Sequence, residues 1–340
     1  MILAATAFYH YVAAFLVFHE KRRIPMHYEI IINEHAGNGT AKQAWSTVHD
    51  LLDQLQADYT SHVTNHPQHE AYIASKLAGR GLADTVVMVI GGDGTLHHTL
   101  NGLQQGRPAD GQQLPLAYIP AGTGNDFARG YGISLKPAHA LQQILAADHP
   151  YSKNIGKYTE AIKGEQGYFL NNIGIGFDAA IVSRTNHSSA KKHLNRIHLG
   201  RFSYLSKALG VIYDQQPFSL MVQANGHHDA YARAFIVVAT NHPFIGGGFQ
   251  VVDTADINDP QIDMVVAERK NWLQTLWILR ALSRGKLSHS KWAHHYHVPK
   301  IHYTTTSLEF GQIDGEEMGN RFFDLTVSDT TYPFYQIPEQ

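Results

Sequence analysis

Apolar runs alternate with amphipathic stretches along the first half of the chain. Apolar runs at 28–32, 85–90 and 116–120 have the length of buried strands. Between them, apolar residues recur at i, i+3 and i+4 spacing and predict helices over 44–55, 67–77 and 96–103. This alternation predicts an α/β fold, a doubly wound parallel sheet that holds a ligand at the carboxyl ends of its strands.

The pattern changes after about residue 150. Short β-rich segments then follow one another, separated by turns such as Asn225-Gly226. They lie at 168–172, 218–222, 234–239 and 262–266, with helices expected near 190–213 and 271–284. These segments predict a mostly antiparallel second domain, a sandwich or a partial barrel. We therefore expect an α/β domain over 26–150 and a β-rich domain over 151–330, with packing of its C-terminal end on the first domain left open.

Residues 1–25 form a separate apolar segment. It runs to Phe18, is interrupted by Thr6 and Tyr9–Tyr11, and closes with Glu20–Arg23. About 18 apolar residues is the short limit for a bilayer span, and the segment lacks the basic start and the cleavage site of a secretory signal. Met26 stands directly before the first strand and could be the true start of translation, which would make the segment a dispensable extension. An interfacial helix and a packed terminal helix stay open as alternatives.

Composition narrows the range of partners. The chain has 340 residues, 44% hydrophobic and 16% charged, with a net charge of -2, which gives no reason to expect nucleic acid. Cysteine is absent, which excludes disulfides and thiolate metal sites and fits the cytoplasm. Histidine is frequent at 23 residues, yet pairs such as His97-His98 lack the spacing of a zinc helix. We therefore interpret them as surface residues rather than a metal site.

Two glycine-rich turns follow two of the predicted strands. Gly91–Thr95 and Gly122–Asp126 each carry an aspartate. A glycine turn at the carboxyl end of a parallel strand lets backbone N–H groups approach a phosphate, and the following helix adds its positive N-terminal end. A single turn is a weak signal, because an ordinary strand-to-helix turn with a capping aspartate has the same composition. Two such turns on neighbouring strands, with Asn33 and Gly37 after the first strand, predict a nucleotide site and a kinase.

Several motifs extend this pattern along most of the chain. They are Gly92–Leu96 followed by Asn101–Leu103, then Pro120–Ala128, Asn172–Asp178 and Asp314–Glu316. Together they resemble the diacylglycerol kinase catalytic-domain family, which includes bacterial soluble lipid kinases, over residues 26 to 330. The resemblance implies a nucleotide-binding domain similar to NAD kinases and phosphofructokinases, a β-sandwich domain for the lipid substrate, and ATP and Mg²⁺ as cofactors.

The resemblance also implies residues for the nucleotide and for magnesium. Positions that match the ATP site are Asn33, Gly37, Thr64, the phosphate turn Gly92, Asp93, Gly94 and Thr95, and also Thr123. Asp93 and Asp126 match acids that organise Mg²⁺, in part through water. A second, structural Mg²⁺ is implied at Asp259 with the backbone carbonyls of Asp256 and Gln261. Mg²⁺ prefers carboxylate and water oxygens, so these residue types suit the role.

Asp314–Glu316 resembles the late catalytic motif of the family. The resemblance implies that Glu316 is the general base for a lipid hydroxyl, acting beside the catalytic acids Asp93 and Asp126. Phosphoryl transfer depends mainly on positioning and on neutralising oxygen charge, which N–H groups and a metal supply. From composition alone, Asp314–Glu317 is a solvated hairpin turn, and only the rest of the pattern reverses that interpretation.

Three departures from the family pattern bear on lipid identity and catalytic rate rather than on the fold. His97-His98 stands where the family usually has Asn-Glu, and Pro260 follows Asp259 where it usually has glycine. Asn154 stands where the family often has an aspartate of the magnesium network, although an amide can still bond a coordinated water. Arg196 lies where a basic partner of that network is expected.

The leading hypothesis is an ATP- and Mg²⁺-dependent lipid kinase that transfers the γ-phosphoryl group to diacylglycerol or a related lipid. Its acyl chains are expected in an apolar cleft beside Phe244, Ile245 and Phe249. Two alternatives stay open: a NAD kinase-like or sugar-phosphate kinase, since these share a Gly-Gly-Asp-Gly-Thr turn, and a catalytically silent lipid- or nucleotide-binding protein. We expect a cytoplasmic protein that meets its lipid at the membrane surface transiently, because no strongly basic helix is evident. A homodimer is left open.

Overall fold

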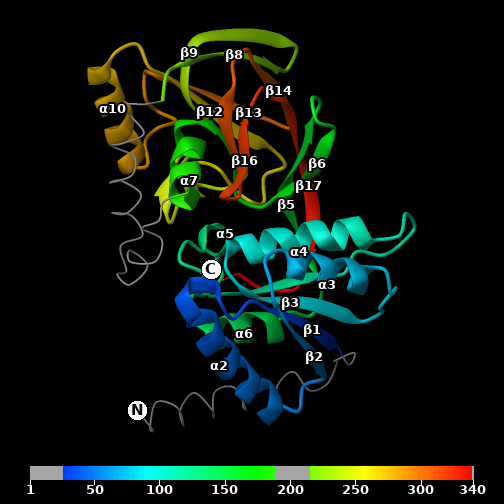
Figure 1. The fold of residues 1–340 in the computed structure, drawn as a ribbon. Coiled ribbons are helices and arrows are strands. Elements are labelled where there is room, and N and C mark those ends of the chain that lie inside the picture. The colour runs from blue at the N-terminus through cyan, green and yellow to red at the C-terminus, as the bar shows by residue number, and fades with distance from the viewer. Residues whose placement is uncertain (1–25, 188–214, 339–340) are drawn as a thin grey trace.

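The computed structural model describes residues 26–187 and 215–338. The segment 1–25, the helix expected near 190–213 and Arg196 lie outside the described residues. Figure 1 shows two domains stacked on each other, the first running from blue through cyan to green below and the second from green to red above. Among the described residues, no helix is both long enough and apolar enough to cross a membrane.

The first domain is an α/β domain of three layers. Its strands are β1 (His27–Ile32), β2 (Tyr59–Val63), β3 (Thr85–Gly91) and β4 (Leu116–Pro120). Its helices are the short 3-10 helix η1 (Ala36–Gly39) and then α2 (Thr40–Gln54), α3 (His69–Ala78), α4 (Asp93–Gly106), α5 (Asp126–Tyr131) and α6 (Pro137–Leu145). The strands pair in parallel in the order β2-β1-β3-β4.

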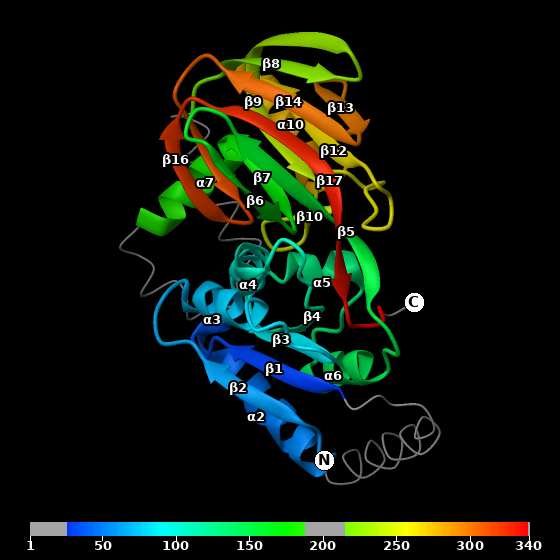
Figure 2. The same ribbon diagram turned by 90° about the vertical axis from the view of Figure 1, so that its right-hand side faces the viewer.

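The hydrophobic pattern explains these layers. Strand β3 is buried along its whole length, as expected for a central parallel strand that is covered on both faces. Helix α2 buries Ala44, Val48 and Leu52, which lie on one side of the helix. Helices α2 and α6 pack together on one face of the sheet, and α3 and α4 pack together on the other (Figure 2). The predicted doubly wound parallel sheet is confirmed.

The second domain is a β-sandwich. Its strands are β5 (Tyr151–Glu160), β6 (Glu165–Phe169), β7 (Asn172–Gly176), β8 (Phe218–Ala224), β9 (His227–Thr240), β10 (Phe244–Ile245), β11 (Phe249–Gln250), β12 (Ile262–Glu268), β13 (Ala293–Val298), β14 (Lys300–Thr305), β15 (Glu309–Ile313), β16 (Glu316–Arg321) and β17 (Asp324–Phe334). Its described helices are α7 (Phe177–His187) and α10 (Trp272–Ser283), and α10 is the helix expected near 271–284.

The described strands of this domain pair with one another in antiparallel fashion. The first half of the long strand β9 pairs with β8, and its second half pairs with β7 and β12, so that β9 joins the two layers. Alternate residues of β8, including Phe218, Leu220 and Val222, point into the core between the layers. A second apolar cluster lies beneath α7 and α10. The predicted antiparallel sandwich is confirmed.

Strands β5 and β17 connect the two domains (Figure 2). They pair with each other from Leu325 to Phe334, and β17 also pairs with β14 of the second domain. At the end of β17, Phe334 pairs with Leu116 of β4. The Gln336 side chain then accepts the N–H of Tyr118 and donates to its carbonyl. The chain therefore enters the second domain along β5 and returns to the first along β17.

Candidate active site

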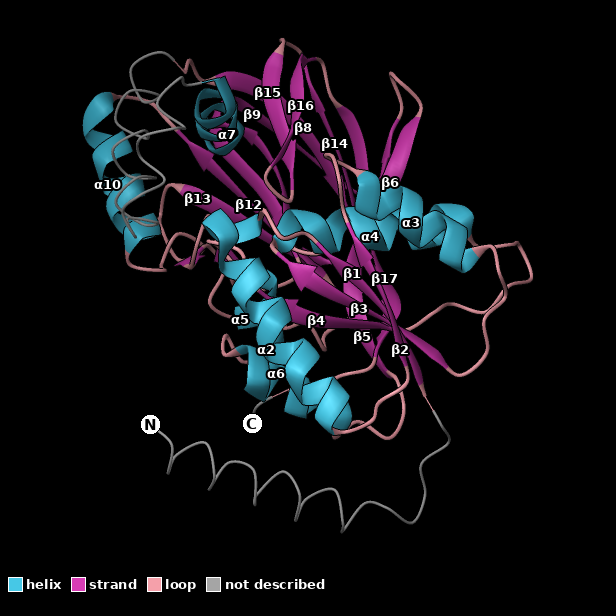
Figure 3. Ribbon diagram, turned by 60° about the horizontal axis from the view of Figure 1, so that its bottom comes forward, coloured by secondary structure: helices cyan, strands magenta, loops and turns pink. Residues whose placement is uncertain are grey.

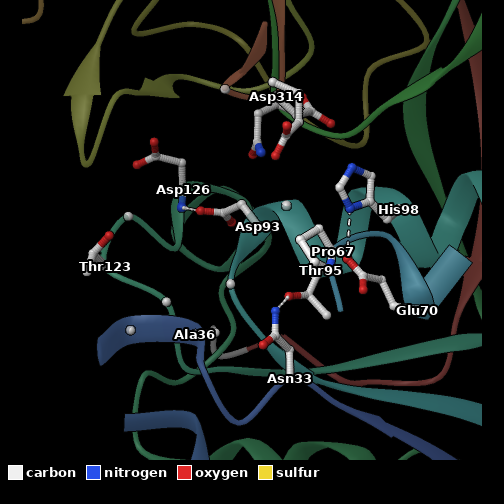
Figure 4. Close-up of a pocket in the computed structure, with 18 of the residues that line it drawn as sticks. Asn33, Ala36, Pro67, Glu70, Asp93, Thr95, His98, Thr123, Asp126 and Asp314 are labelled. Carbon is white, nitrogen blue, oxygen red and sulfur yellow. Dashed lines mark hydrogen bonds and ion pairs between the residues drawn. The ribbon is translucent and has the colours of Figure 1, made fainter. Parts of the chain in front are cut away.

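The carboxyl edge of the parallel sheet opens into a cavity of about 890 Å³ that residues of both domains line. One wall consists of the loops after β1, β3 and β4, and the opposite wall includes the β15–β16 turn, α7 and the β10–β11 turn. Figure 4 shows side chains that point into it. The cavity brings together the residues expected at the nucleotide, Asn33, Gly37, Thr64, Gly92, Asp93, Gly94, Thr95 and Thr123, and two residues expected to take part in catalysis, Asp126 and Glu316.

The two glycine turns contact each other directly. A Cβ added to Gly122 would lie 2.7 Å from the Cα of Gly92 and 2.9 Å from the Oδ1 of Asn125. Only glycine allows the turns to approach this closely. Asn125 fixes the second turn, because its Oδ1 accepts the N–H of Gly122 at 2.9 Å and its Nδ2 donates to the Gly122 carbonyl at 3.0 Å. The two turns therefore form one continuous backbone surface along the cavity.

The loop after β1 is tied to both turns. The Asn33 Nδ2 donates to the Oγ1 of Thr95 at 3.1 Å (Figure 4). The Thr40 Oγ1 donates to the carbonyl of Ala121 at 2.8 Å, just before the second turn. Gly37 adopts a φ of 58° and lies against Ala121, so that a side chain at residue 37 would be strained as well as crowded. These bonds fix the three loops relative to one another.

Asp126, which is buried, and Asp93, which is half-buried, lie at the centre of the site. The carboxylate of Asp93, the first residue of α4, accepts the N–H of Asp126 at 3.1 Å and of Phe127 at 3.3 Å. Burial, together with the negative charge of Asp126, raises the pKa of Asp93 to about 7 in spite of those two N–H groups. The Asp126 Oδ2 accepts the N–H of Gly247 at 2.8 Å, which links the β10–β11 turn to the first domain. A proton or a cation would relieve the repulsion between these acids.

Gly124 leaves a space between the two carboxylates. A Cβ at residue 124 would lie 3.2 Å from the Oδ2 of Asp93 and 3.9 Å from the Oδ2 of Asp126. Mg²⁺ is commonly held by one or two carboxylates together with waters and substrate phosphates, so this pair of acids fits a cation that a phosphate shares. Within 26–187 and 215–338, no group of three or more histidines or acids is arranged to hold a metal by itself.

Glu316 reaches the cavity from the second domain. Strands β15 and β16 are joined by the turn Asp314-Gly315, whose φ values of 49° and 83° are both left-handed, as in a type I′ hairpin. A Cβ at Gly94 would lie 3.3 Å from the Oε1 of Glu316. The hairpin turn expected from composition alone is therefore real, and it also sets a carboxylate against the phosphate turn.

Asp314 anchors this hairpin to both domains. Its side chain is completely buried, and it accepts the N–H groups of Leu170, Asn171 and Asn172 at 2.8 to 3.0 Å. The Nδ1 of His97 on α4 lies 2.8 Å from its Oδ2. His97, one of the departures from the family pattern, therefore helps to hold the motif that carries Glu316.

His98 and Glu70 also line the cavity, and the sequence analysis did not assign them to the site. The Nδ1 of His98 lies 2.8 Å from the Oε1 of Glu70 on α3 (Figure 4). Burial lowers the pKa of His98, but the hydrogen bond to Glu70 and the charges of Glu316, Glu70 and Asp314 together raise it above its ordinary value. The sequence could have predicted His98 as a cavity residue, because it follows the phosphate turn within a few residues. No local pattern predicts that Glu70 lines the cavity.

The residues assigned to a second magnesium lie outside this cavity. The Oδ2 of Asp259 is 3.2 Å from the Nε2 of His297. The Asp256 carbonyl accepts the N–H of Asp259, and the Asp259 carbonyl accepts the N–H of Gln261. The segment forms a tight turn whose acid faces an imidazole, and the second magnesium stays a prediction.

Asn154 is a buried residue of β5 and does not line the cavity. Its N–H donates to the carbonyl of Ile257 at 3.1 Å, and its own carbonyl accepts the Nδ2 of Asn241 at 2.9 Å. The first bond joins β5 to the segment that holds Asp259, and the second joins β5 to the loop after β9.

The expected acyl cleft is wrong for two of its three residues, whereas Phe244 beside them is half-buried. Ile245 and Phe249 are 2% and 4% exposed, because both pack into the apolar cluster beneath α7 and α10. The β10–β11 hairpin lines the cavity only through Gly246 and Gly247. The apolar part of the lining beside the second domain comes instead from Ile181 and Val182 of α7.

Comparisons with known proteins agree with this arrangement. The diacylglycerol kinase catalytic domain matches residues 27–155, and the YegS C-terminal NAD kinase beta sandwich-like domain matches residues 171–329. A Bacillus subtilis (strain 168) protein named "Putative lipid kinase YtlR" is 29% identical over 311 residues, which span 89% of this chain and 97% of that protein. A "Diacylglycerol kinase" of the same strain is 24% identical over 258 residues, 76% of this chain and 78% of that protein.

Solved structures show the same fold. A crystal structure described as "a putative diacylglycerol kinase from Bacillus anthracis str. Sterne" superposes with a TM-score of 0.73 at 21% identity, covering 94% of this chain and 97% of that one. Because both domains of the chain match family models, the chain belongs to the diacylglycerol kinase-like family of lipid kinases.

Proposed function

We propose that this protein transfers the γ-phosphoryl group of ATP to a hydroxyl of diacylglycerol or a related lipid, with Mg²⁺ bound at Asp93 and Asp126. The observation that supports the proposal most directly is the approach of Glu316 to Gly94 of the phosphate turn. This approach supports a role for the Glu316 carboxylate beside the acceptor hydroxyl and a phosphate bound by the first domain.

The backbone and the side chains of the site have separate roles in the proposed reaction. The two glycine turns offer N–H groups to phosphate oxygens, and bound Mg²⁺ would neutralise charge on those oxygens. Glu316 accepts the proton of the lipid hydroxyl. The hydroxyl oxygen forms a bond to the γ-phosphorus while the bond between that phosphorus and the β–γ bridging oxygen breaks, and ADP leaves with that electron pair. His98, held by Glu70, balances negative charge near Glu316.

The test is ADP release and lipid phosphate formation by the purified chain with ATP, Mg²⁺ and detergent micelles that contain diacylglycerol. Glu316→Gln keeps the shape of the side chain but cannot accept the proton, so we expect kcat to fall about 10²- to 10⁴-fold. Glu317→Gln is the matched control, because Glu317 faces the Oγ of Ser183 instead. We expect that variant to stay close to wild type.

A panel of acceptors separates the remaining alternatives. Phosphorylation of NAD or of a sugar phosphate but of no lipid would replace the lipid kinase by a small-molecule kinase. Tight ATP binding in a calorimeter with no turnover on any acceptor would indicate a silent binding protein. Equal rates for Glu316→Gln and Glu317→Gln would remove Glu316 from its role as the base.

A further inference from the structure

Helix α10 turns an apolar face to the outside of the protein. Trp272, Leu273, Leu276 and Trp277 are 65%, 54%, 48% and 62% exposed. Their spacing of i, i+1, i+4 and i+5 places them on one side of the helix. Figures 1 and 3 both show α10 on the outer flank of the second domain.

The opposite side of α10 anchors the helix firmly. Ile278 and Leu282 pack into the apolar cluster beneath it, and Thr275 is completely buried. Asn271 caps the helix by accepting the N–H of Gln274 at 2.9 Å. The apolar outer face therefore belongs to a well-anchored helix.

The patch on α10 differs from the other exposed apolar side chains. Those side chains are spread over several other elements among the described residues: Val63, Tyr72, Leu135, Ile162, Met221, Leu308 and Phe322. A contiguous exposed apolar patch marks an interaction surface, whereas scattered exposed residues need no explanation.

Positive charge surrounds this face. The segment 269–291 contains six lysines and arginines and no aspartate or glutamate. Lys270, Arg280, Arg284 and Lys286 are exposed, and we find no ion pair between any of these four and another residue within 26–187 or 215–338. Tryptophan together with lysine and arginine is the composition of a helix that lies in the headgroup layer of a bilayer.

The helix is connected to the cavity by one short hairpin. Gly285, just beyond α10, lies against Gln250 of β11, so that a Cβ at residue 285 would be 2.8 Å from its Oε1. The turn of the same hairpin lines the cavity through Gly246 and Gly247, and the N–H of Gly247 donates to Asp126. A surface bound by α10 would thus lie near the site that requires a lipid.

We propose that the exposed face of α10 docks the protein on an anionic lipid bilayer, with the two indoles at the headgroup level and the surrounding cations at lipid phosphates. The purpose of this contact rests on the proposed lipid kinase function, but the binding itself requires no turnover. A second copy of the chain fits the face less well. Packing α10 against α10 about a two-fold axis would set the cations at the ends of one helix, Lys270, Arg280 and Arg284, against those of the other.

The test is sedimentation of the full chain with vesicles of phosphatidylcholine, alone or mixed with phosphatidylglycerol. We expect binding to the mixed vesicles that weakens as salt is added. The double variant Trp272→Ala/Trp277→Ala should bind about tenfold or more weakly, because it removes two large apolar groups. Arg280→Gln/Arg284→Gln should lose about 20- to 30-fold on mixed vesicles, since each cation near an anionic surface contributes about fivefold.

Matched controls lie elsewhere on the surface. Ile162→Ala/Leu308→Ala removes two side chains that are 59% and 55% exposed, and Lys42→Gln/Arg80→Gln removes two exposed cations. Both variants should bind as wild type does. Insertion of the indoles should also shift tryptophan emission to shorter wavelength, and the shift should be absent from the double tryptophan variant.

The proposal is overturned if wild type ignores the mixed vesicles or if the α10 variants bind them as wild type does. It is also overturned if the same substitutions dissociate a dimer and leave vesicle binding unchanged. In micelles that carry the lipid acceptor, the α10 variants should phosphorylate it at the wild-type rate. On vesicles that carry the same acceptor, their phosphorylation rate should fall below that of wild type. If wild type phosphorylates no lipid at all, the proposed function fails, while vesicle binding still decides the role of α10.

Discussion

Replacing Gly122 by alanine would force the two glycine turns apart. The new Cβ would stand 2.7 Å from the Cα of Gly92, whereas carbon atoms in contact prefer about 3.5 to 4.0 Å. The turns must therefore separate by about 1 Å. The φ of Gly122 lies outside the left-handed region, so the change tests crowding and not backbone strain.

The expected loss is larger in activity than in stability. Crowding a packed site costs about 1 to 3 kcal/mol of folding free energy. A displacement of about 1 Å in a site that works by positioning can cost about 100-fold in rate. We expect Gly122→Ala to remain folded, with kcat/KM for ATP lowered by about two orders of magnitude, as measured by ADP release and by urea unfolding.

Gly79→Ala is the matched control. Gly79 ends α3 with a φ of -72°, and an added Cβ would meet its nearest neighbours at 3.6 Å, an ordinary contact. This variant should keep its activity and stay within about 0.5 kcal/mol of wild type. If Gly122→Ala is folded and as active as Gly79→Ala, contact between the two turns is not needed for function, and the reasoning about the phosphate surface is wrong.

Three further predictions concern protons and metal. Gly124→Ala should raise the Mg²⁺ concentration needed for half-maximal activity about tenfold, because its methyl group enters the space between the carboxylates of Asp93 and Asp126. Its stability should change by about 1 kcal/mol or less. An unchanged Mg²⁺ titration would contradict this prediction. Burial lowers the pKa of His242 from 6.5 to about 4. The unfolded chain therefore takes up the proton first, and stability should be full above pH 6.5 and fall by about 3 kcal/mol as the pH drops to 4; urea unfolding of His242→Gln should show a shallower fall. Glu70→Gln should lower the pKa of His98, seen as a shifted imidazole resonance in an NMR titration, and an unshifted resonance would show that Glu70 does not set it.

The class of the fold was predictable because local pattern and global topology agree in the first domain. Strand β3 reads as a continuous apolar run and is buried on both faces. The turns Gly91–Thr95 and Gly122–Asp126 need glycine for their close approach, and the glycines are visible in the sequence itself. The joint contribution of β5 and β17 to both domains was not predictable, since pairing between strands so distant in the chain leaves no local signal.

The acids of the site illustrate the same limit. Asp93 and Asp126 follow predicted strands, so a parallel sheet was expected to bring them to one edge. Glu316 lies on a hairpin whose composition suggests only a solvated turn, and its approach to Gly94 depends on how the two domains are placed. Ile245 and Phe249 were predicted beside a lipid cleft but lie in the packed core. Apolar character alone does not distinguish these two environments.

The return of β17 to the first domain has a consequence for synthesis of the protein. Tyr332, Phe334 and Tyr335 belong to the same apolar core as β1 and β3, and Gln336 is completely buried against Tyr118. While a ribosome is still making the second domain, the first domain lacks part of its interior. The first domain therefore cannot complete its core during translation before the residues around 334 have emerged.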